Sequence, residues 1–206
     1  MNIGLYKYED AEFNHSHEYL LPSLIKVLRR YVTSTNPRLF DLGCGNGATM
    51  NLLNSIGYSV VGVDPSTEGV TQANMQYPDM MIQFGHSGEN LSERFGNFDV
   101  VYSLEVIEHV FDPYEYIEQI YLLLEDKGIC ILSTPYHGYF KNIVISLLGK
   151  WDKHFTVLWK GGHIKFWSKS TIMKLLQVQG FELLDILRVG RVPILAKSMV
   201  VIARKI

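Results

Sequence analysis

The run Asp41-Leu42-Gly43-Cys44-Gly45-Asn46-Gly47 carries three glycines at alternate positions, directly after the apolar stretch 38–42. Glycine has no Cβ atom, so each of these residues can adopt a positive φ and lets the backbone approach a ligand closely. The next residues, 48–56, have the pattern of a helix, and the first amides of a helix can face an anionic group. We therefore expect a ligand to bind where this first strand ends and its helix begins.

Asp64 ends the next apolar stretch, 21 residues after Gly43. A carboxylate in that position typically accepts hydrogen bonds from the hydroxyls of a ribose. The glycine spacing is GxGxG rather than the dinucleotide pattern GxGxxG, and Asp41 adds a negative charge that repels a pyrophosphate. S-adenosylmethionine carries a ribose, an ammonium, a carboxylate and a sulfonium but no phosphate, so the pattern favours it over a nicotinamide dinucleotide.

Strands and helices alternate along most of the chain. Strands are predicted at 38–42, 58–63, 80–84, 98–103 and 128–133, with helices at 17–31, 48–56, 67–76, 114–124 and 170–179. Two further strands, 181–189 and 198–204, lie close enough in sequence to form an antiparallel hairpin at the sheet edge. The predicted fold is α/β and Rossmann-like: a doubly wound, mostly parallel seven-stranded sheet with this hairpin and a helical insertion after the fifth strand.

The composition of the chain argues against a nucleic-acid-binding protein and against a membrane-spanning one. The 206 residues include 19 Lys and Arg against 21 Asp and Glu, so no global positive charge points to nucleic acid. Cys44 and Cys130 do not form a metal-type CxxC pair, and no apolar run reaches the length of about 18 residues that a membrane-spanning helix needs. The first residues lack the layout of a signal peptide. These features predict a cytoplasmic protein that acts without a nucleic-acid partner.

Three segments together resemble a known family. The run 41–47, Val63-Asp64 and Phe98-Asp99-Val100-Val101 are similar, in this order, to the motifs of class I S-adenosylmethionine-dependent methyltransferases. Ser103-Leu104-Glu105-Val106-Ile107-Glu108-His109-Val110 resembles the branch of the ubiquinone-biosynthesis O-methyltransferases (polyprenyl-hydroxyphenyl methylases). The resemblance covers roughly residues 38–135, and the terminal helix and hairpin more loosely.

The resemblance implies roles for individual residues. Asp41, Gly43 and Gly45 would hold the methionine part of the cofactor and Asp64 its ribose. Pro65 and Ser66 would border the adenine, and Leu104 would pack nearby. The family often has an acid after its third strand, whereas this chain has Gly85-His86-Ser87-Gly88-Glu89, in which Ser87 is the candidate for that contact.

Glu105, Glu108 and His109 stand at i, i+3 and i+4, on one face if the segment is helical. Two carboxylates and an imidazole can bind a divalent cation, and some members of the similar branch use magnesium, which would ionise a phenolic oxygen. Imidazole, however, suits zinc or iron better than magnesium. In the structural alternative, the glutamate bonds neighbouring backbone and the histidine packs against the sheet.

The segment 135–167 fits no strand–helix alternation and contains all three tryptophans. Part of it, 139–151, is apolar with lysines near each end, which suits a peripheral membrane contact. A lid over the methyl acceptor and a helical cap with an ordinary core are the alternatives. We expect one domain over 1–206: an N-terminal helical cap (1–37), a cofactor-binding core (38–134), an acceptor lid (135–167), and a terminal helix and hairpin (168–206).

An oxygen acceptor with a high pKa needs a base, and the candidates in this segment are His137, His154 and His163, of which His163 and His137 are preferred. The sequence as a whole predicts O-methylation of a small aromatic, quinol-like or glycolipid acceptor, with S-adenosylmethionine as donor and a divalent cation such as magnesium as a second cofactor. Two competing hypotheses are an inactive methyltransferase-like binding or regulatory protein and a nucleotide-dependent oxidoreductase.

Overall fold

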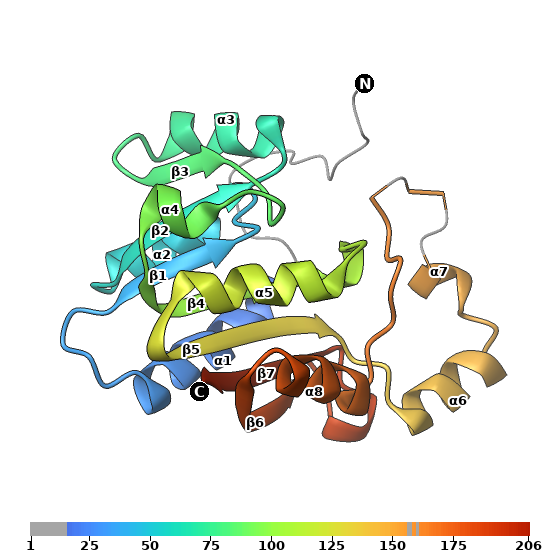
Figure 1. Cartoon of the computed structure of the whole chain (residues 1–206). Coiled ribbons are helices and arrows are strands. Elements are labelled where there is room, and N and C mark those ends of the chain that lie inside the picture. The colour runs from blue at the N-terminus through green and yellow to red at the C-terminus, as the bar shows by residue number, and fades with distance from the viewer. Residues whose placement is uncertain (1–15, 156–157, 160) are drawn as a thin grey trace.

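The computed structural model describes residues 16–155, 158–159 and 161–206. Its centre is a seven-stranded sheet in the order β3-β2-β1-β4-β5-β7-β6 (Figure 1). The strands are β1 (Arg38–Leu42), β2 (Ser59–Asp64), β3 (Met81–Phe84), β4 (Phe98–Leu104), β5 (Leu124–Pro135), β6 (Phe181–Val189) and β7 (Ser198–Lys205). Strands β1 to β5 are parallel, whereas β7 lies antiparallel between β5 and β6. The predicted doubly wound α/β sheet with an antiparallel C-terminal hairpin is confirmed.

Helices cover both faces of this sheet. They are α1 (His17–Tyr31), α2 (Ala48–Ser55), α3 (Thr67–Gln76), α4 (Leu91–Phe95), α5 (Pro113–Leu123), α6 (Tyr139–Leu147), α7 (Asp152–Phe155) and α8 (Lys169–Val178). Because successive strand residues point to opposite faces, Leu39 packs with apolar residues of α1, α2 and α3, while Phe40 packs with those of α4, α5 and α8. The sheet is therefore buried on both sides, which explains why its central strands are almost wholly apolar.

Local signals in the sequence begin several of these helices. The Ser66 hydroxyl accepts a hydrogen bond from the Gly69 amide at the start of α3. Asp112 accepts hydrogen bonds from two amides of α5, which has a proline in its first turn. Ser168 caps α8. Such side chains satisfy amide donors that have no partner within the helix.

Two elements differ from the sequence prediction. Helix α4 was not expected, because its five residues are too few to show a helical periodicity. Strand β5 begins at Leu124 rather than at residue 128, since Glu125, Asp126 and Lys127 are exposed and charged and hide the strand pattern. Neither difference changes the edge of the sheet where the parallel strands end.

The insertion after β5 is helical, as predicted. Helices α6 and α7 lie to one side of the sheet in Figure 1, followed by an extended return to α8. The predicted N-terminal cap includes residues 1–15, which lie outside the described residues. Among the residues that the structure describes, no helix combines the length and the apolar character needed to cross a membrane.

Candidate functional site

The glycine loop makes a tight turn between β1 and α2. Gly43, Gly45 and Gly47 all have positive φ, at 95°, 55° and 77°. The amides of Gly43 and Cys44 both donate to the Val63 carbonyl oxygen, at 2.9 and 3.0 Å. A Cβ atom on Gly43 would lie 2.6 Å from Cγ2 of Val106, so a larger residue there would clash as well as being strained. The predicted need for glycine thus has a structural cause at this position.

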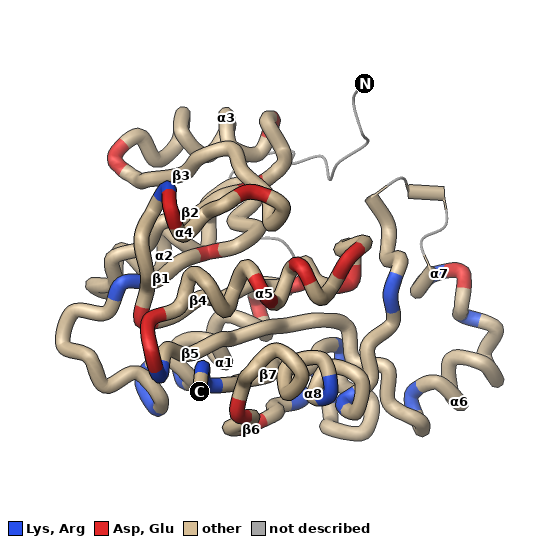
Figure 2. Tube along the Cα trace, viewed as in Figure 1, with Lys and Arg blue, Asp and Glu red and all other residues tan. Residues whose placement is uncertain are grey.

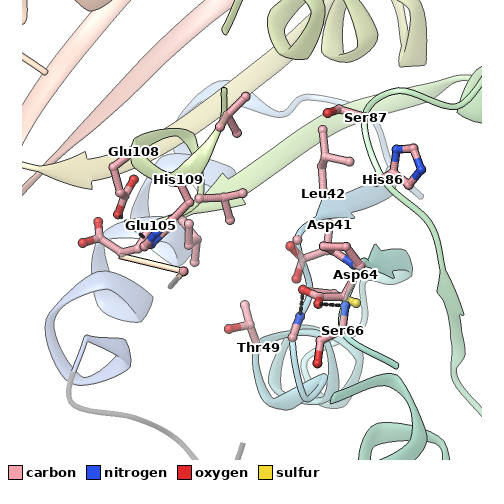
Figure 3. Close-up of a pocket in the computed structure, with 18 of the residues that line it drawn as sticks. Asp41, Leu42, Thr49, Asp64, Ser66, His86, Ser87, Glu105, Glu108 and His109 are labelled. Carbon is pink, nitrogen blue, oxygen red and sulfur yellow. Dashed lines mark hydrogen bonds and ion pairs between the residues drawn. The ribbon is translucent and has the colours of Figure 1, made fainter. Parts of the chain in front are cut away.

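Asp64, at the end of β2, organises the same loop. Its Oδ2 accepts a hydrogen bond from the Gly45 amide and its Oδ1 one from the Ser66 amide, both at 2.8 Å (Figure 3). The side chain is largely buried, and burial raises the pKa of this carboxyl, while the two amide donors lower it. Each carboxylate oxygen has a second lone pair, so hydroxyl donors of a ligand can still be accepted.

Asp41 is the second acid beside the loop. It lies in β1 and is 3% exposed. Burial raises the pKa of Asp41 to about 8, and the nearby Asp64 adds to the shift. A cationic ligand group would offset this cost, because an opposite charge stabilises the ionised carboxylate.

One pocket of about 540 Å³ joins these acids to the turn after β4. It is lined by all eight residues that the sequence predicts to bind the cofactor: Asp41, Gly43, Gly45, Asp64, Pro65, Ser66, Ser87 and Leu104. Figure 3 shows Asp41, Asp64 and Ser66 toward one side of the view, and Glu105, Glu108 and His109 toward the other. We call these the donor half and the acceptor half of the pocket.

The turn after β4 is not the single α-helical face that the spacing of its acids suggested. Glu105 has a left-handed backbone, with φ at 56°, and a 3₁₀ turn (Ile107–His109) follows it. The Glu105 amide donates to the carbonyl and to the hydroxyl of Ser133, at 3.1 and 3.0 Å. These hydrogen bonds to β5 hold the Glu105 backbone in a conformation that residues other than glycine seldom adopt. The side chains of Glu105 and Glu108 have different surroundings.

Both oxygens of the Glu105 carboxylate accept a hydrogen bond from a serine. Oε1 accepts a hydrogen bond from the Ser133 hydroxyl at 2.7 Å, and Oε2 accepts one from Ser198 at 3.1 Å. Burial raises the pKa of Glu105 to about 7, against the lowering effect of the two serines. Glu105 therefore ties the end of β4 to β5 and β7.

Glu108 differs from Glu105 in the hydrogen bonding of its carboxylate. It is 1% exposed, and neither of its carboxylate oxygens has a hydrogen bond of normal geometry from another described residue, although the Thr134 hydroxyl lies close enough to lower its pKa. Burial, together with the charge of Glu105, raises the pKa of Glu108 well above its ordinary value. An ionised carboxylate in such surroundings is costly unless a cation approaches it. Nε2 of His109 lies 4.0 Å from Oε1 of Glu108.

His163 reaches this turn from the insertion. The amides of Ile164 and Lys165 both donate to the Glu108 carbonyl oxygen, at 3.0 and 3.1 Å. The rings of His163 and His109 consequently lie with their centroids 5.0 Å apart. Burial lowers the pKa of His163 to about 4, and the neighbouring His109 contributes. The structure therefore places His163 beside Glu108 and His109, two of the three residues that the sequence predicts to bind a metal ion.

His137, the other predicted base, is not among the residues that line the pocket. Its ring packs against Phe166, with centroids 4.5 Å apart, and its Nδ1 lies 3.3 Å from Oδ1 of Asn142. Burial and the charge of Lys141 lower the pKa of His137 to about 4. It belongs to an aromatic cluster within the insertion.

Several lining residues were not expected from the sequence. They are Ser16 and Leu20 from the start of α1, Thr49 from α2 and Tyr116 from α5, whereas Trp159 and Gly161 lie in the segment predicted to be the lid. The apolar periodicity of α1 shows that one of its faces is buried, but it does not say against what. The crowding of aromatic residues in 151–167 points to Trp159, but no local pattern points to Ser16, Leu20, Thr49 or Tyr116.

Comparison with known proteins agrees with this geometry. Residues 13–186 match the family model described as a methyltransferase domain. The chain is 32% identical over 157 residues to a ubiquinone biosynthesis O-methyltransferase of Ruegeria pomeroyi, covering 72% of this chain and 61% of that protein. It is 30% identical over 181 residues to the protein of the same name from Dinoroseobacter shibae, covering 82% and 71%. The match thus spans less than two thirds of the Ruegeria protein.

Solved structures share the fold. Magnesium protoporphyrin IX methyltransferase from Synechocystis PCC 6803, solved with bound SAH, superposes with a TM-score of 0.70 at 20% identity, over 97% of this chain and 91% of that one. A putative methyltransferase from Bacillus halodurans has a TM-score of 0.69 at 15% identity, over 89% and 99%. The chain belongs to the methyltransferase-domain family and has the class I fold of its S-adenosylmethionine-dependent members.

Proposed function

We propose that this chain binds S-adenosylmethionine in the donor half of the pocket and transfers its methyl group to an oxygen atom of a small aromatic or quinol-like acceptor in the acceptor half. The observation that carries the proposal is the single pocket that joins Asp41 and Asp64 to Glu105, Glu108 and His163. Relatives named as O-methyltransferases of ubiquinone biosynthesis support the oxygen acceptor. A glycolipid is the alternative acceptor.

The donor half suits the charges of the cofactor. The Asp41 carboxylate would pair with the ammonium group, and Asp64 would accept hydrogen bonds from the ribose hydroxyls. The positive φ values of Gly43 and Gly45 turn the backbone past the methionine part without a Cβ in the way. Pro65, Ser66 and Ser87 would border the adenine, and Leu104 would pack near it.

Methyl transfer is an in-line displacement at the sulfonium carbon, so the protein contributes chiefly by aligning the two reactants. The acceptor hydroxyl must also lose its proton. His163 is the predicted base that lines the pocket, but with a pKa of about 4 its imidazole is by itself a weak base for a phenol. We propose that a divalent cation assists in the acceptor half, and that 135–167 acts as the lid over it.

Calorimetric titration of the purified protein with S-adenosylmethionine, S-adenosylhomocysteine and NAD tests the cofactor assignment. We expect micromolar binding of the two sulfur ligands and none of NAD. Binding of NAD alone would favour the oxidoreductase. Binding of the sulfur ligands without methylation of any catechol, quinol or glycolipid offered would favour the inactive regulatory protein.

We also propose that α6 contacts a membrane surface at its periphery. Tyr139, Phe140 and Leu147 are 76%, 59% and 81% exposed, and Leu148 follows them at 58%. Lysines lie on and after the helix, and no acidic residue lies on it (Figure 2). An apolar face flanked by cations suits an anionic bilayer, from which a lipidic quinol would reach the pocket.

Sedimentation with phosphatidylglycerol vesicles tests this contact. The wild-type protein should pellet with these vesicles and less with phosphatidylcholine, and Leu147→Glu should reduce the bound fraction severalfold. Met75→Glu is the matched control, since Met75 is also 81% exposed but lies on α3. If Leu147→Glu and Met75→Glu pellet to the same extent, α6 does not make the membrane contact.

A further inference from the structure

We propose that Glu108, His109 and His163 form a binding site for a divalent transition-metal ion of the zinc type, and that Glu105 is not one of its ligands. One ligand atom from each of the three residues lies within 4.8 Å of the others. This inference deepens the proposed function, because it assigns ligands and a chemical class to the cation in the acceptor half.

The first argument is the state of Glu108. Its carboxylate is buried and lines the pocket, yet among the described residues only the Thr134 hydroxyl comes near its oxygens, and it makes no hydrogen bond of normal geometry. Buried polar groups without a partner are rare in folded proteins, and a carboxylate is among the costliest of them. Glu105, three residues earlier, has hydrogen bonds from Ser133 and Ser198 to its two oxygens. Glu108, whose oxygens lack well-formed hydrogen bonds, is therefore the acid that a cation would stabilise.

The second argument is the orientation of His109. Its Nδ1 lies 3.2 Å from the Gly162 carbonyl oxygen. A carbonyl can only accept, so Nδ1 carries the proton and Nε2 presents its lone pair. That Nε2 atom is the one that lies 4.0 Å from Oε1 of Glu108. Metal-bound histidines are commonly oriented in this way, with the other ring nitrogen donating to a carbonyl or carboxylate.

The third argument is how the fold holds His163. The amides of Ile164 and Lys165 bond the Glu108 carbonyl oxygen, and the indole Nε1 of Trp167 donates to the Ile107 carbonyl oxygen at 3.3 Å. These bonds fasten the return from the insertion onto the turn after β4. Backbone contacts of the residues that follow His163 thus place it beside His109, 54 positions earlier in the chain, and the His163 ring has a further hydrogen bond with the backbone of His154.

The donor set indicates the class of metal. Two imidazole nitrogens and one carboxylate oxygen suit zinc, cobalt or ferrous iron, whereas magnesium prefers oxygen ligands throughout. In a tetrahedral zinc site the ligand atoms are about 3.4 Å apart, so the three side chains need to approach by about 1 Å on binding. Three protein ligands leave a fourth position open to the pocket. When bound there, such an ion lowers the pKa of a coordinated phenol or water.

Cobalt(II) provides a readout that does not depend on activity. Metal-free protein, titrated with cobalt(II) chloride, should show visible absorption bands of a four- or five-coordinate site at one equivalent, and zinc should displace them. Mutation of a group that only supports a metal ligand costs about 10- to 100-fold in affinity, so Glu108→Gln, His109→Ala and His163→Ala, which remove a ligand, should each weaken cobalt binding by about a hundredfold. If His163→Ala does not fold, as judged by its thermal midpoint, His163→Gln replaces it.

Two control variants define the site. Glu105→Gln and His154→Ala should keep the cobalt spectrum, because Glu105 is held by serines and His154 lies outside the cluster. Loss of binding in Glu105→Gln but not in His163→Ala would overturn the assignment, as would absence of cobalt and zinc binding. Titration with S-adenosylmethionine, run on the same samples, separates this inference from the proposed function: either ligand can bind while the other fails.

Discussion

The Asp64 carboxylate accepts a hydrogen bond from the Gly45 amide at 2.8 Å, across 19 residues of sequence. Its other oxygen accepts one from the Ser66 amide, which begins the turn into α3. A single side chain therefore joins the loop after β1 to the loop after β2. The carboxylate that is proposed to hold the ribose is also the one that shapes the glycine loop around it.

Asp64→Ala should weaken S-adenosylmethionine binding by about 1–3 kcal/mol, which is the usual cost of leaving buried polar partners unmet. The Gly45 amide loses its acceptor in this variant, so the glycine loop also becomes less ordered. Calorimetric titration measures the change. Asp126→Ala, an exposed position near the start of β5, is the control and should bind as the wild type does. An unchanged affinity in Asp64→Ala would place the ribose elsewhere.

The affinity for S-adenosylmethionine should rise with pH up to about 8 and then fall. Below pH 8 the Asp41 carboxyl, with its pKa raised to about 8, holds a proton that it must release to pair with the ligand's ammonium. The increase is at most about tenfold per pH unit. Above pH 8 an α-ammonium, with its ordinary pKa of about 8, itself loses its proton.

Titrations between pH 6 and 9.5 measure this profile. Asp41→Asn should lose the rising part, because the amide does not titrate, and keep the falling part. A rising part of equal slope in that variant would assign the titration to another group.

Gly43→Ala should destabilise the protein more than Gly57→Ala. Both positions have nearly the same positive φ, 95° and 98°, so the backbone cost of about 1–2 kcal/mol is shared. Only at Gly43 would the new Cβ meet another side chain, 2.6 Å from Cγ2 of Val106. We expect an additional loss of about 1–3 kcal/mol there.

Chemical denaturation of the two variants measures the difference. Adding Val106→Ala to Gly43→Ala should recover part of the additional loss, since it removes the clashing methyl groups. If the double variant recovers nothing, the clash is not the cause.

Ser133→Ala should cost more stability at pH 8 than at pH 5.5. Burial raises the pKa of Glu105 to about 7 from an ordinary value near 4.5, so the folded state loses stability as pH rises between these values. The Ser133 hydroxyl opposes that loss by donating to the ionised carboxylate. Without it, we expect a loss of about 1–3 kcal/mol at pH 8.

Urea denaturation at the two pH values provides the comparison. Leu132→Ala, at the neighbouring buried position of the same strand, is the control and should lose the same stability at both pH values, because it removes no polar group. Equal losses for Ser133→Ala at both pH values would mean that the serine does not act through the charge of Glu105.

The donor half of the pocket was predictable because its residues are local in sequence. A strand, a glycine turn and a helix place Gly43 and Gly45 within a few residues of Asp41, and Asp64 ends the strand that pairs with β1. Parallel strands end at the same edge of a sheet, so alternating apolar and polar stretches suffice to bring these residues together. The same alternation predicted the five parallel strands and the terminal hairpin, but not the order β3-β2-β1-β4-β5-β7-β6 in which they lie in the sheet.

The arrangement of residues in the acceptor half could not be predicted from the sequence, because it depends on contacts between distant segments. Spacing alone grouped Glu105 with Glu108 and His109, but a left-handed residue turns Glu105 toward Ser133 and Ser198. His163 joins Glu108 because backbone hydrogen bonds fasten the return of the insertion to the turn after β4. The sheet, the glycine loop and the acids beside it could be predicted because they follow from short-range periodicity. Which glutamate has hydrogen-bond partners, and which histidine lies beside His109, depends on packing between segments far apart in the chain.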